Sequence, residues 1–376
     1  MDRIKYFCYY DFQDVKKPRE GVQAASSKID YIIDAINRCD IKVDIISKSG
    51  ISSKGFNLDF GGIHYKGINT LRHFFSFGCN GNVLRVLSRW LQNVHFFLWT
   101  LFNVKRHEEI IVYHSLGYCR LMCWIVRLKS CVIIGEIEEF YQDVHTYSSS
   151  LCRAEKQFIN TCEKYMFPTA IMNTKFNLNH KKFIIVHGVY KQVTISEQKF
   201  QDGRIHVVYG GTFDPQKGGA LAAAGIGRYL NEKYAIHICG FGSETDKAKI
   251  INIINDVNRH SESKTYFEGY LSGEQYAKFI QKCHVGLSTQ NPSGAFNETS
   301  FPSKILVYMA NGLDVVTVDI PVVRTSLVSN YLYFYKEQTS KSIADTIMNV
   351  KIGTQQHNKM LNVIDQQFVN EIKKIL

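Results

Sequence analysis

IHVVYGGTFDPQKGG, residues 205–219, joins a predicted strand over Ile205–Tyr209 to a predicted helix that begins at Gly219. The glycines of the turn let the backbone approach a ligand closely, and the helix presents free amide hydrogens and a positive dipole to an anion. Lys217 adds a cation at the same turn. The spacing is neither G-x-G-x-x-G nor a Walker loop, so it supports neither a dinucleotide nor a nucleoside-triphosphate site. The alternative is a turn whose glycines serve only strand-to-helix packing.

Strands and helices alternate on both sides of this turn. Downstream, helices separate the predicted strands Ala235–Cys239, Thr265–Phe267, Val285–Leu287 and Asp314–Thr317. Upstream, the predicted strands are Ile4–Tyr10, Lys42–Ile46, Ile110–Tyr113, Cys131–Ile134, Thr169–Met172 and Phe183–Val186. Alternation of this kind indicates an α/β protein with doubly wound parallel sheets.

A chain of 376 residues is long enough for two such domains with a cleft between them. A polar segment without apolar periodicity, residues 190–204, is the predicted linker. The sequence thus predicts an N-terminal Rossmann-like domain over 1–190 and a second over 191–355. A final helix within 356–376 is expected to pack back on the first domain.

The composition is that of an ordinary globular protein. Its cysteines and its apolar segments indicate the cellular compartment in which the protein lies. Ten cysteines lie scattered without a C-x-x-C pair, which indicates reduced thiols. No signal peptide begins the chain, and the longest lightly charged run, Trp90–Val104, is shorter than the ~20 residues of a membrane-spanning helix. We therefore expect a cytoplasmic protein. Its net charge of +11 predicts an anionic partner, either nucleic acid, anionic lipid or a phosphorylated substrate.

A second candidate site is NETSFPSK, residues 297–304, which precedes a helix that ends at YMANG, residues 308–312. Its first amides are predicted to face the carboxyl ends of the strands, where open α/β sheets bind ligands. Glu298 lies beside them, and a carboxylate there suits sugar hydroxyls better than a phosphate, which it would repel. The alternative is an N-capped helix next to a solvated Glu.

The order of these motifs resembles the donor domain of glycosyltransferase family 4 and its polysaccharide-building relatives. The resemblance covers about a hundred residues and rests on five landmarks: the turn from Gly211 to Gly218, then ICGFG (238–242), FEGY (267–270), VGLS (285–288), and Glu298 with FPSK (301–304) ahead of YMANG. It implies the GT-B fold, in which two Rossmann-like domains face each other across a cleft. It also implies a nucleotide-sugar donor, UDP-sugar favoured, and transfer of a hexose-type sugar with retention of configuration. No metal or other cofactor is implied, and the relatives suggest synthesis of a bacterial surface polysaccharide such as capsule or O-antigen.

The resemblance also implies roles for individual residues. Lys217 would neutralise the donor diphosphate, Glu298 would contact the donor sugar, and His114, which follows a strand, would lie near that sugar; these three are the catalytic candidates. Gly21 belongs to a loop resembling the one that covers the donor phosphates. The complete donor-binding set is Gly21, Gly211, Thr212, Lys217, Gly240, Gly242, Glu298, Phe301, Pro302, Ser303 and Lys304. The alternative for His114 is a structural histidine, and for Gly21 a solvated turn.

Two departures from the family pattern affect the donor site. Thr212 replaces an Arg that usually follows the first glycine, and Val307 replaces a Glu that usually binds the ribose. Lys304 would supply part of the missing positive charge. These departures keep open an alternative function, a catalytically silent GT-B subunit that supports another transferase.

On the acceptor side, Glu136, Glu138 and Glu139 follow a predicted strand. Clustered carboxylates there would bind the hydroxyls of a saccharide or lipid-linked saccharide acceptor, or act as a base. The alternative is a solvated loop.

The basic, aromatic segment 83–106 has apolar residues at helical spacing. One interpretation is a peripheral contact with anionic membrane at the inner face of the cell membrane. The alternative, a core helix of the first domain with snorkelling arginines, is favoured for its apolar face. Nucleic-acid binding is a weaker alternative function, because the cations are dispersed and no nucleic-acid module is present, so no nucleic-acid partner is expected. An NAD-dependent oxidoreductase would need the three-glycine fingerprint that the chain lacks.

Overall fold

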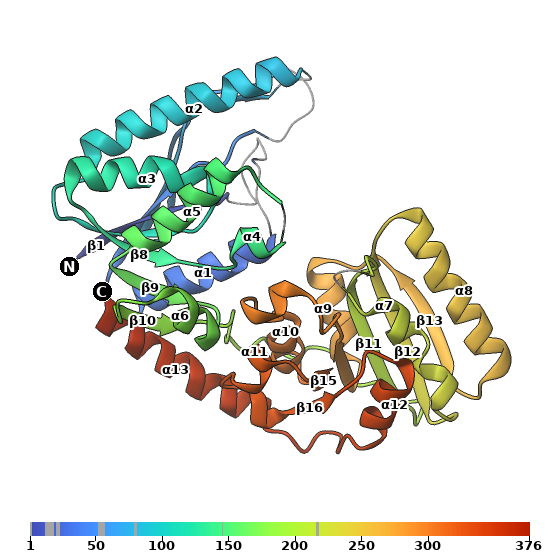
Figure 1. Cartoon of the computed structure of the whole chain (residues 1–376). Coiled ribbons are helices and arrows are strands. Elements are labelled where there is room, and N and C mark those ends of the chain that lie inside the picture. The colour runs from blue at the N-terminus through green and yellow to red at the C-terminus, as the bar shows by residue number, and fades with distance from the viewer. Residues whose placement is uncertain are drawn as a thin grey trace. The chain divides into compact units, whose positions relative to one another are not determined.

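The computed structural model describes residues 2–11, 19, 23–51, 57–78, 81–144, 146–215 and 218–376. The chain forms two compact units, one of Met1–Val186 with Gln367–Leu376 and one of His187–Gln366. Both are α/β units built on a parallel sheet (Figure 1).

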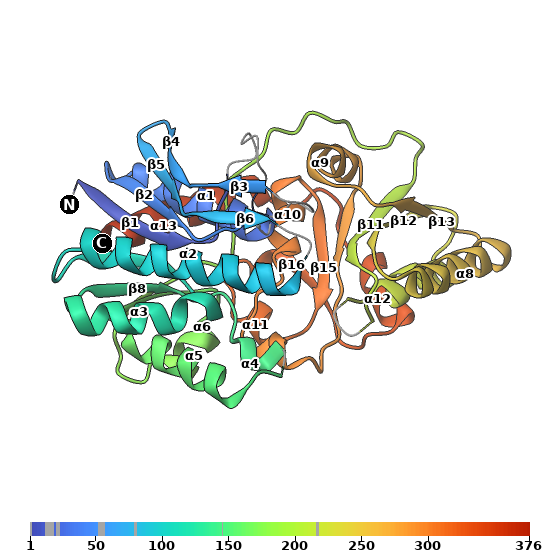
Figure 2. The same cartoon turned by 90° about the horizontal axis from the view of Figure 1, so that it is seen from above.

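Unit 1 is built on a sheet with the order β10-β9-β8-β7-β1-β2-β5-β4 among the described residues. Its pairs are parallel except β4 with β5. Helices α2, α3 and α5 cover one face and α1 the other (Figures 1 and 2). The strands are β1 (Arg3–Cys8), β2 (Lys42–Ser47), β4 (Gly62–Lys66), β5 (Asn69–His73), β7 (Glu109–Tyr113), β8 (Val132–Glu136), β9 (Lys164–Phe167) and β10 (Lys182–Ile185), with β3 (Asn57–Asp59) and β6 (Ser76–Gly78) forming a separate pair. The helices are α1 (Gln23–Asn37), α2 (Asn82–Asn103), α3 (Leu116–Lys129), α4 (Tyr141–Val144), α5 (Ser149–Thr161) and α6 (Ala170–Phe176).

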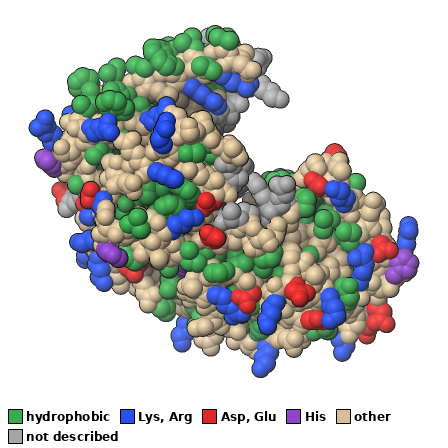
Figure 3. Space-filling model, viewed as in Figure 1, with side chains coloured by type: hydrophobic (Ala, Val, Ile, Leu, Met, Phe, Trp, Pro, Cys, Tyr) green, Lys and Arg blue, Asp and Glu red, His purple; other side chains and the backbone are tan. Residues whose placement is uncertain are grey.

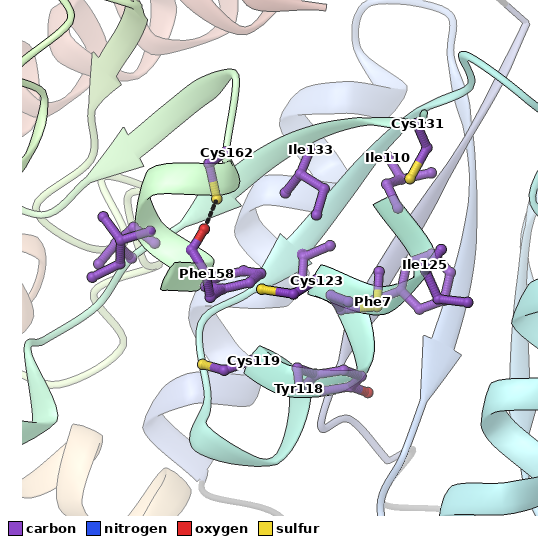
Figure 4. Packing of buried hydrophobic residues seen from close by; sticks show 14 of the residues in the cluster. Phe7, Ile110, Tyr118, Cys119, Cys123, Ile125, Cys131, Ile133, Phe158 and Cys162 are labelled. Atoms are coloured by element: carbon purple, nitrogen blue, oxygen red, sulfur yellow. Dashed lines mark hydrogen bonds between the residues drawn. The ribbon is translucent and has the colours of Figure 1, made fainter. Parts of the chain in front are cut away.

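The core of unit 1 fills the space between the sheet and α3 and α5. Figure 4 shows Phe7 and Ile133 from the sheet with Tyr118 and Phe158 from the helices. Cysteines share this core, and the nine within the described ranges are all free thiols, as the spacing predicted. The end of the last helix, α13 (His357–Ile375), also belongs to this unit, where Phe368 stacks on Tyr31 of α1 with ring centroids 5.3 Å apart.

Helix α2 lies with its polar side toward the sheet. Its buried residues are Ser88, Gln92, Phe96 and Thr100. The Ser88 hydroxyl donates to the carbonyl oxygen of Phe77 at 2.9 Å and accepts from the amide of the same residue at 3.0 Å, and the Gln92 amide donates to the Ser49 carbonyl at 3.2 Å. Most of the apolar residues at helical spacing are exposed instead. The prediction that the apolar face of this segment packs into the core is therefore wrong for most of that face. The inward face instead carries polar side chains, because buried backbone groups beneath the helix require hydrogen-bonding partners.

The predicted strand Thr169–Met172 is also wrong, because α6 begins there. Thr169 is the N-cap of that helix, and its hydroxyl accepts from the Met172 amide at 3.1 Å. Local capping thus outweighed the apolar, β-branched composition on which the strand prediction rested.

Unit 2 has a fully parallel sheet with the order β13-β12-β11-β14-β15-β16 among its described residues. The chain leaves β11 in one direction to β12 and β13 and returns to its other side at β14. The carboxyl ends of β11 and β14 therefore flank the topological switch point, where doubly wound sheets bind ligands. The strands are β11 (Ile205–Thr212), β12 (Tyr234–Phe241), β13 (Lys264–Gly269), β14 (Val285–Ser288), β15 (Asp314–Val318) and β16 (Leu332–Tyr335).

Short helical segments connect these strands. They are α7 (Ala220–Ala224), η1 (Ile226–Tyr229), α8 (Glu244–His260), α9 (Gly273–Gln281), η2 (Ala295–Glu298), α10 (Lys304–Ala310), α11 (Pro321–Arg324), η3 (Ser329–Tyr331), α12 (Ser340–Met348) and the start of α13. Segment 289–303 connects β14 to α10 and contributes most of the site described next. None of the described helices in either unit combines the length and the apolarity needed to cross a membrane.

Candidate functional site

A cavity of about 240 Å³ lies at the switch point of the unit 2 sheet. The ends of β11 and β14 form one side of it, and segment 300–304 forms another. Seven of its ten lining residues have a hydroxyl, amide or ammonium side chain; the ten are Thr212, Gly218, Ser288, Thr289, Gln290, Ser300, Phe301, Pro302, Ser303 and Lys304. The site is therefore chemically suited to a polar or charged ligand.

Gly211 makes room for the Lys304 ammonium. A Cβ atom at Gly211 would lie 2.0 Å from Lys304 Nζ and 2.7 Å from its Cε. The ammonium instead lies over the ring of Tyr209, 4.6 Å from its centroid. Tyr209 is held in turn by donating to the Thr212 carbonyl at 2.6 Å. Gly211 was predicted to let a ligand approach the backbone. In the structure the space beside it is occupied by the Lys304 ammonium.

The charge of Lys304 has no carboxylate partner among the described residues. Burial lowers the pKa of Lys304 from 10.5 to about 8. Desolvation without a counter-ion disfavours the charged form of Lys304. An anion that entered the cavity would stabilise the ammonium and raise this pKa again. The contact with the Tyr209 ring offsets only part of the desolvation penalty. Lys304 is therefore a cation placed to receive an anion.

Two further polar atoms near the cavity lack hydrogen-bonding partners within the described part of the chain. They are the Thr289 hydroxyl and the Gln338 side-chain nitrogen, both buried. A Cβ atom at Gly219 would lie 2.5 Å from the Thr289 hydroxyl oxygen and 2.1 Å from that nitrogen, so Gly219 leaves the two groups close together. Buried donors without partners are costly unless a ligand or water satisfies them.

The remaining glycines and Phe301 support the site. A Cβ atom at Gly240 would lie 1.8 Å from the Gly211 carbonyl oxygen, and one at Gly242 would lie 2.7 Å from Cβ of Phe213. These glycines thus permit close packing at the ends of β11 and β12, and neither lines the cavity. The Phe301 ring stacks on His187 at 4.6 Å, which anchors the segment that precedes Lys304.

Several predicted donor-site residues lie elsewhere or cannot be placed. Glu298 is exposed at the end of η2 and is not among the residues that line the cavity. Val307, at the position of the family's ribose-binding Glu, is 40% exposed on α10. Gly21 and Lys217 lie outside the described residues. Thr212, Phe301, Pro302, Ser303 and Lys304 all line this one cavity.

In unit 1, two of the three acceptor-side acids belong to one cluster. Glu136 is buried at the end of β8 and accepts from the Tyr6 hydroxyl, while Glu138 pairs with Lys28. Burial, and then the charge of Glu138, raise the pKa of Glu136 to about 8. Glu136 is therefore mostly protonated at neutral pH, unlike an ordinary surface carboxylate. Glu139 is partly buried in the loop that follows.

His114 is fully buried behind this edge of the sheet. Its ring is parallel to that of Phe158, with centroids 5.8 Å apart, and its Nε2 lies 3.4 Å from Oε1 of Glu155. Burial lowers the pKa of His114 to about 4, so the ring is neutral at pH 7. In this conformation the ring is shielded from solvent.

Sequence reasoning missed Thr289, Gln290 and Gln338. Ser-Thr-Gln follows the strand Val285–Ser288 directly, and this polar run at a strand end was a usable signal for the first two. No local sequence signal marked Gln338. It follows the last strand of the sheet, and only the folded order of the strands brings it next to Gly219.

Among the comparisons with known proteins, the solved structures identify the fold. No protein-family profile matches the sequence, and no curated protein matches it. Solved structures do match over the whole chain. An Escherichia coli structure titled as trehalose-6-phosphate bound with UDP-2-fluoro glucose has a TM-score of 0.62 at 11% identity, covering 100% of this chain and 99% of that one.

Two other matches have the same extent. A UDP-forming α,α-trehalose-phosphate synthase from Burkholderia xenovorans in complex with glucose-6-phosphate has a TM-score of 0.60 at 9% identity, covering 99% of this chain and 100% of that one. The N-terminal domain of Candida albicans trehalose-6-phosphate phosphatase has a TM-score of 0.59 at 10% identity, covering 100% and 95%. The chain therefore has the GT-B fold, which confirms the predicted fold class.

Proposed function

We propose that this chain is a glycosyltransferase that moves a hexose-type sugar from a nucleotide-sugar donor, UDP-sugar favoured, to a saccharide or lipid-linked saccharide acceptor. The proposal rests mainly on the position of Lys304. This cation has no carboxylate partner in the described structure and lines the cavity at the switch point of unit 2. A diphosphate supplies the negative charge that this cation lacks. Structural neighbours with the same fold, crystallised with a UDP-sugar or with glucose-6-phosphate, support the same class of ligands.

The groups at the cavity suit the departure of a nucleoside diphosphate. During transfer the bond between the anomeric carbon and a diphosphate oxygen breaks, and a bond to an acceptor hydroxyl oxygen forms. Negative charge then develops on the leaving diphosphate, which takes the acceptor proton. A fixed ammonium in a partly desolvated site stabilises that charge more than water does. Thr289 and Gln338 add buried hydrogen-bond donors near the same place.

The finer parts of the proposal follow from the family resemblance. They are retention of configuration, transfer without a metal ion, roles for Lys217, Glu298 and His114, and a place in bacterial surface polysaccharide synthesis. A cytoplasmic protein in peripheral contact with the membrane would fit a lipid-linked acceptor.

The test is a transfer assay on the purified full chain with a panel of UDP-sugars and saccharide acceptors, read as UDP release. We expect Lys304→Met to lower kcat/KM by about 100-fold or more, the range seen when one stabilising charge or donor is removed. The matched control is Lys351→Met, at an exposed lysine of unit 2, which should retain wild-type activity. Equal rates for wild type and Lys304→Met would reject the assignment of Lys304.

A specific observation favours a second candidate, a catalytically silent GT-B subunit. Val307 places an exposed apolar side chain where the family pattern has a carboxylate for the ribose. A silent subunit would bind UDP through Lys304 and release no sugar with any donor. Binding without turnover, measured by calorimetry beside the transfer assay, would therefore favour the second candidate over the first.

A further inference from the structure

Helix α2 carries an apolar stripe that the described residues of unit 1 leave uncovered. Val83 is 82% exposed, Trp90 58% and Phe102 79%, in a helix of 22 residues. The eight large apolar residues that it exposes are Val83, Leu84, Val86, Leu87, Trp90, Val94, Leu98 and Phe102. Figure 3 shows hydrophobic side chains gathered along the upper edge of the molecule, where Figure 1 places α2.

The stripe lies on the opposite side of the helix from the residues that hold α2 to the sheet. Residues 88, 92, 96 and 100 face inward, and each residue of a helix is rotated by about 100° from the one before. Positions 83, 87, 90, 94 and 98 therefore point away from the sheet. Polar side chains fix the inner face through hydrogen bonds to backbone. Turning the apolar stripe inward would break these bonds, so the outward orientation belongs to the fold.

The charged side chains on α2 and next to it in sequence are basic. Residues 60–107 contain no Asp or Glu and six Lys or Arg residues. Arg85 and Arg89 lie on α2 itself, and Lys105 and Arg106 follow its end. Figure 3 shows Lys and Arg side chains beside the apolar band. An apolar stripe with cations at its margins matches the acyl and phosphate layers of an anionic bilayer surface.

We propose that the outward face of α2 docks on an anionic lipid bilayer, with the stripe in the interfacial layer and Arg85, Lys105 and Arg106 near the lipid phosphates. A second copy of the chain is a poorer occupant. In a two-fold contact over α2, the cations of both copies would meet with no acid on the helix to neutralise them. The docking is independent of sugar transfer, although it would bring unit 1 close to a lipid-linked acceptor.

The test is flotation of the full chain with vesicles of phosphatidylcholine alone and with 30% phosphatidylglycerol. We expect binding to the anionic vesicles that weakens with salt. Trp90→Glu with Leu87→Glu should lower the partition coefficient by at least about tenfold, because two apolar anchors are lost and two negative charges are added. The matched control, Leu178→Glu, alters a leucine of unit 1 that is 76% exposed and lies outside α2, and it should bind like wild type.

A second pair of variants separates charge from apolar contact. Arg85→Gln with Lys105→Gln should weaken binding to anionic vesicles and reduce its salt dependence. All variants should keep wild-type UDP binding, so that failure of docking is distinguishable from failure of the donor site. Undiminished binding of the Trp90→Glu, Leu87→Glu chain would overturn the proposal. So would a soluble dimer that these substitutions dissociate, since a second copy would then cover the stripe.

Discussion

At the scale of single residues, the pKa of Lys304 reflects its burial and should respond to a bound ligand. Its pKa of about 8 lies below the value of 10.5 for an unfolded lysine. Between those pH values the unfolded chain binds more protons, so the contribution of this group makes the free energy of unfolding rise with pH in that window. A bound diphosphate would favour the ammonium and raise the pKa of Lys304 again.

This linkage predicts how UDP affinity depends on pH. Above about pH 8, binding of UDP must take up a proton on Lys304, so Kd should rise by up to about tenfold per pH unit. Calorimetric titrations between pH 7 and 10 would measure this slope. Lys304→Met should show weaker binding and no slope above pH 8. An identical slope in that variant would mean that another group titrates.

Glu136 provides a residue-scale prediction in unit 1. Its pKa of about 8 exceeds the 4.5 of an unfolded Glu, so the folded chain binds more protons between those values. The free energy of unfolding should therefore fall as pH rises from 4.5 to 8. Glu136→Gln keeps a polar partner for Tyr6 without the charge. We expect it to stabilise the protein at pH 8 by about 1–3 kcal/mol and to have little effect at pH 5. Thermal unfolding at both pH values is the measurement, and a constant difference would contradict the protonated state.

At the scale of elements, β11 and β12 approach each other closely because each has a glycine just before its last residue. Gly211 pairs with Gly240 in the register of these strands. A Cβ atom at Gly240 would meet the Gly211 backbone oxygen at 1.8 Å, so Gly240→Ala must push the strand ends apart.

We expect Gly240→Ala to destabilise unit 2 by about 2 kcal/mol or more, and to weaken UDP binding because Gly211 and Lys304 shift with the strand. The control is Gly62→Ala, at a position in β4 where an added Cβ meets nothing within 4 Å. Urea unfolding and calorimetry would compare the two. Equal stability of both variants would show that the strand ends adapt without cost.

Some elements were predictable from sequence and others were not, for physical reasons. The strand and turn at 205–212 carry strong local signals, an apolar run and paired glycines. Periodicity also showed that the apolar residues of α2 share a face. It could not show which face turns inward, because Ser88 and Gln92 act through backbone groups distant in sequence. The donor-site residues of 301–304 came from the order of motifs, whereas Gln338 meets Gly219 only through the folded sheet.

At the scale of the whole molecule, each unit has ionisable side chains near the carboxyl ends of its parallel strands. In unit 2 the edge holds Lys304 and the polar cavity, and in unit 1 it holds the buried carboxyl of Glu136 and the neutral ring of His114. The cation at the unit 2 edge suits the diphosphate of the proposed donor, whereas the Glu136 carboxyl is buried away from solvent. The proposed donor site depends on the binding of a diphosphate at Lys304.

Hydrogen–deuterium exchange of the full chain with and without saturating UDP locates that ligand directly. We predict slower exchange in peptides covering 210–215, 288–290 and 300–306, and no such protection in Lys304→Met at the same UDP concentration. Protection confined to other segments of the chain, or unchanged exchange throughout at saturating UDP, would contradict this prediction.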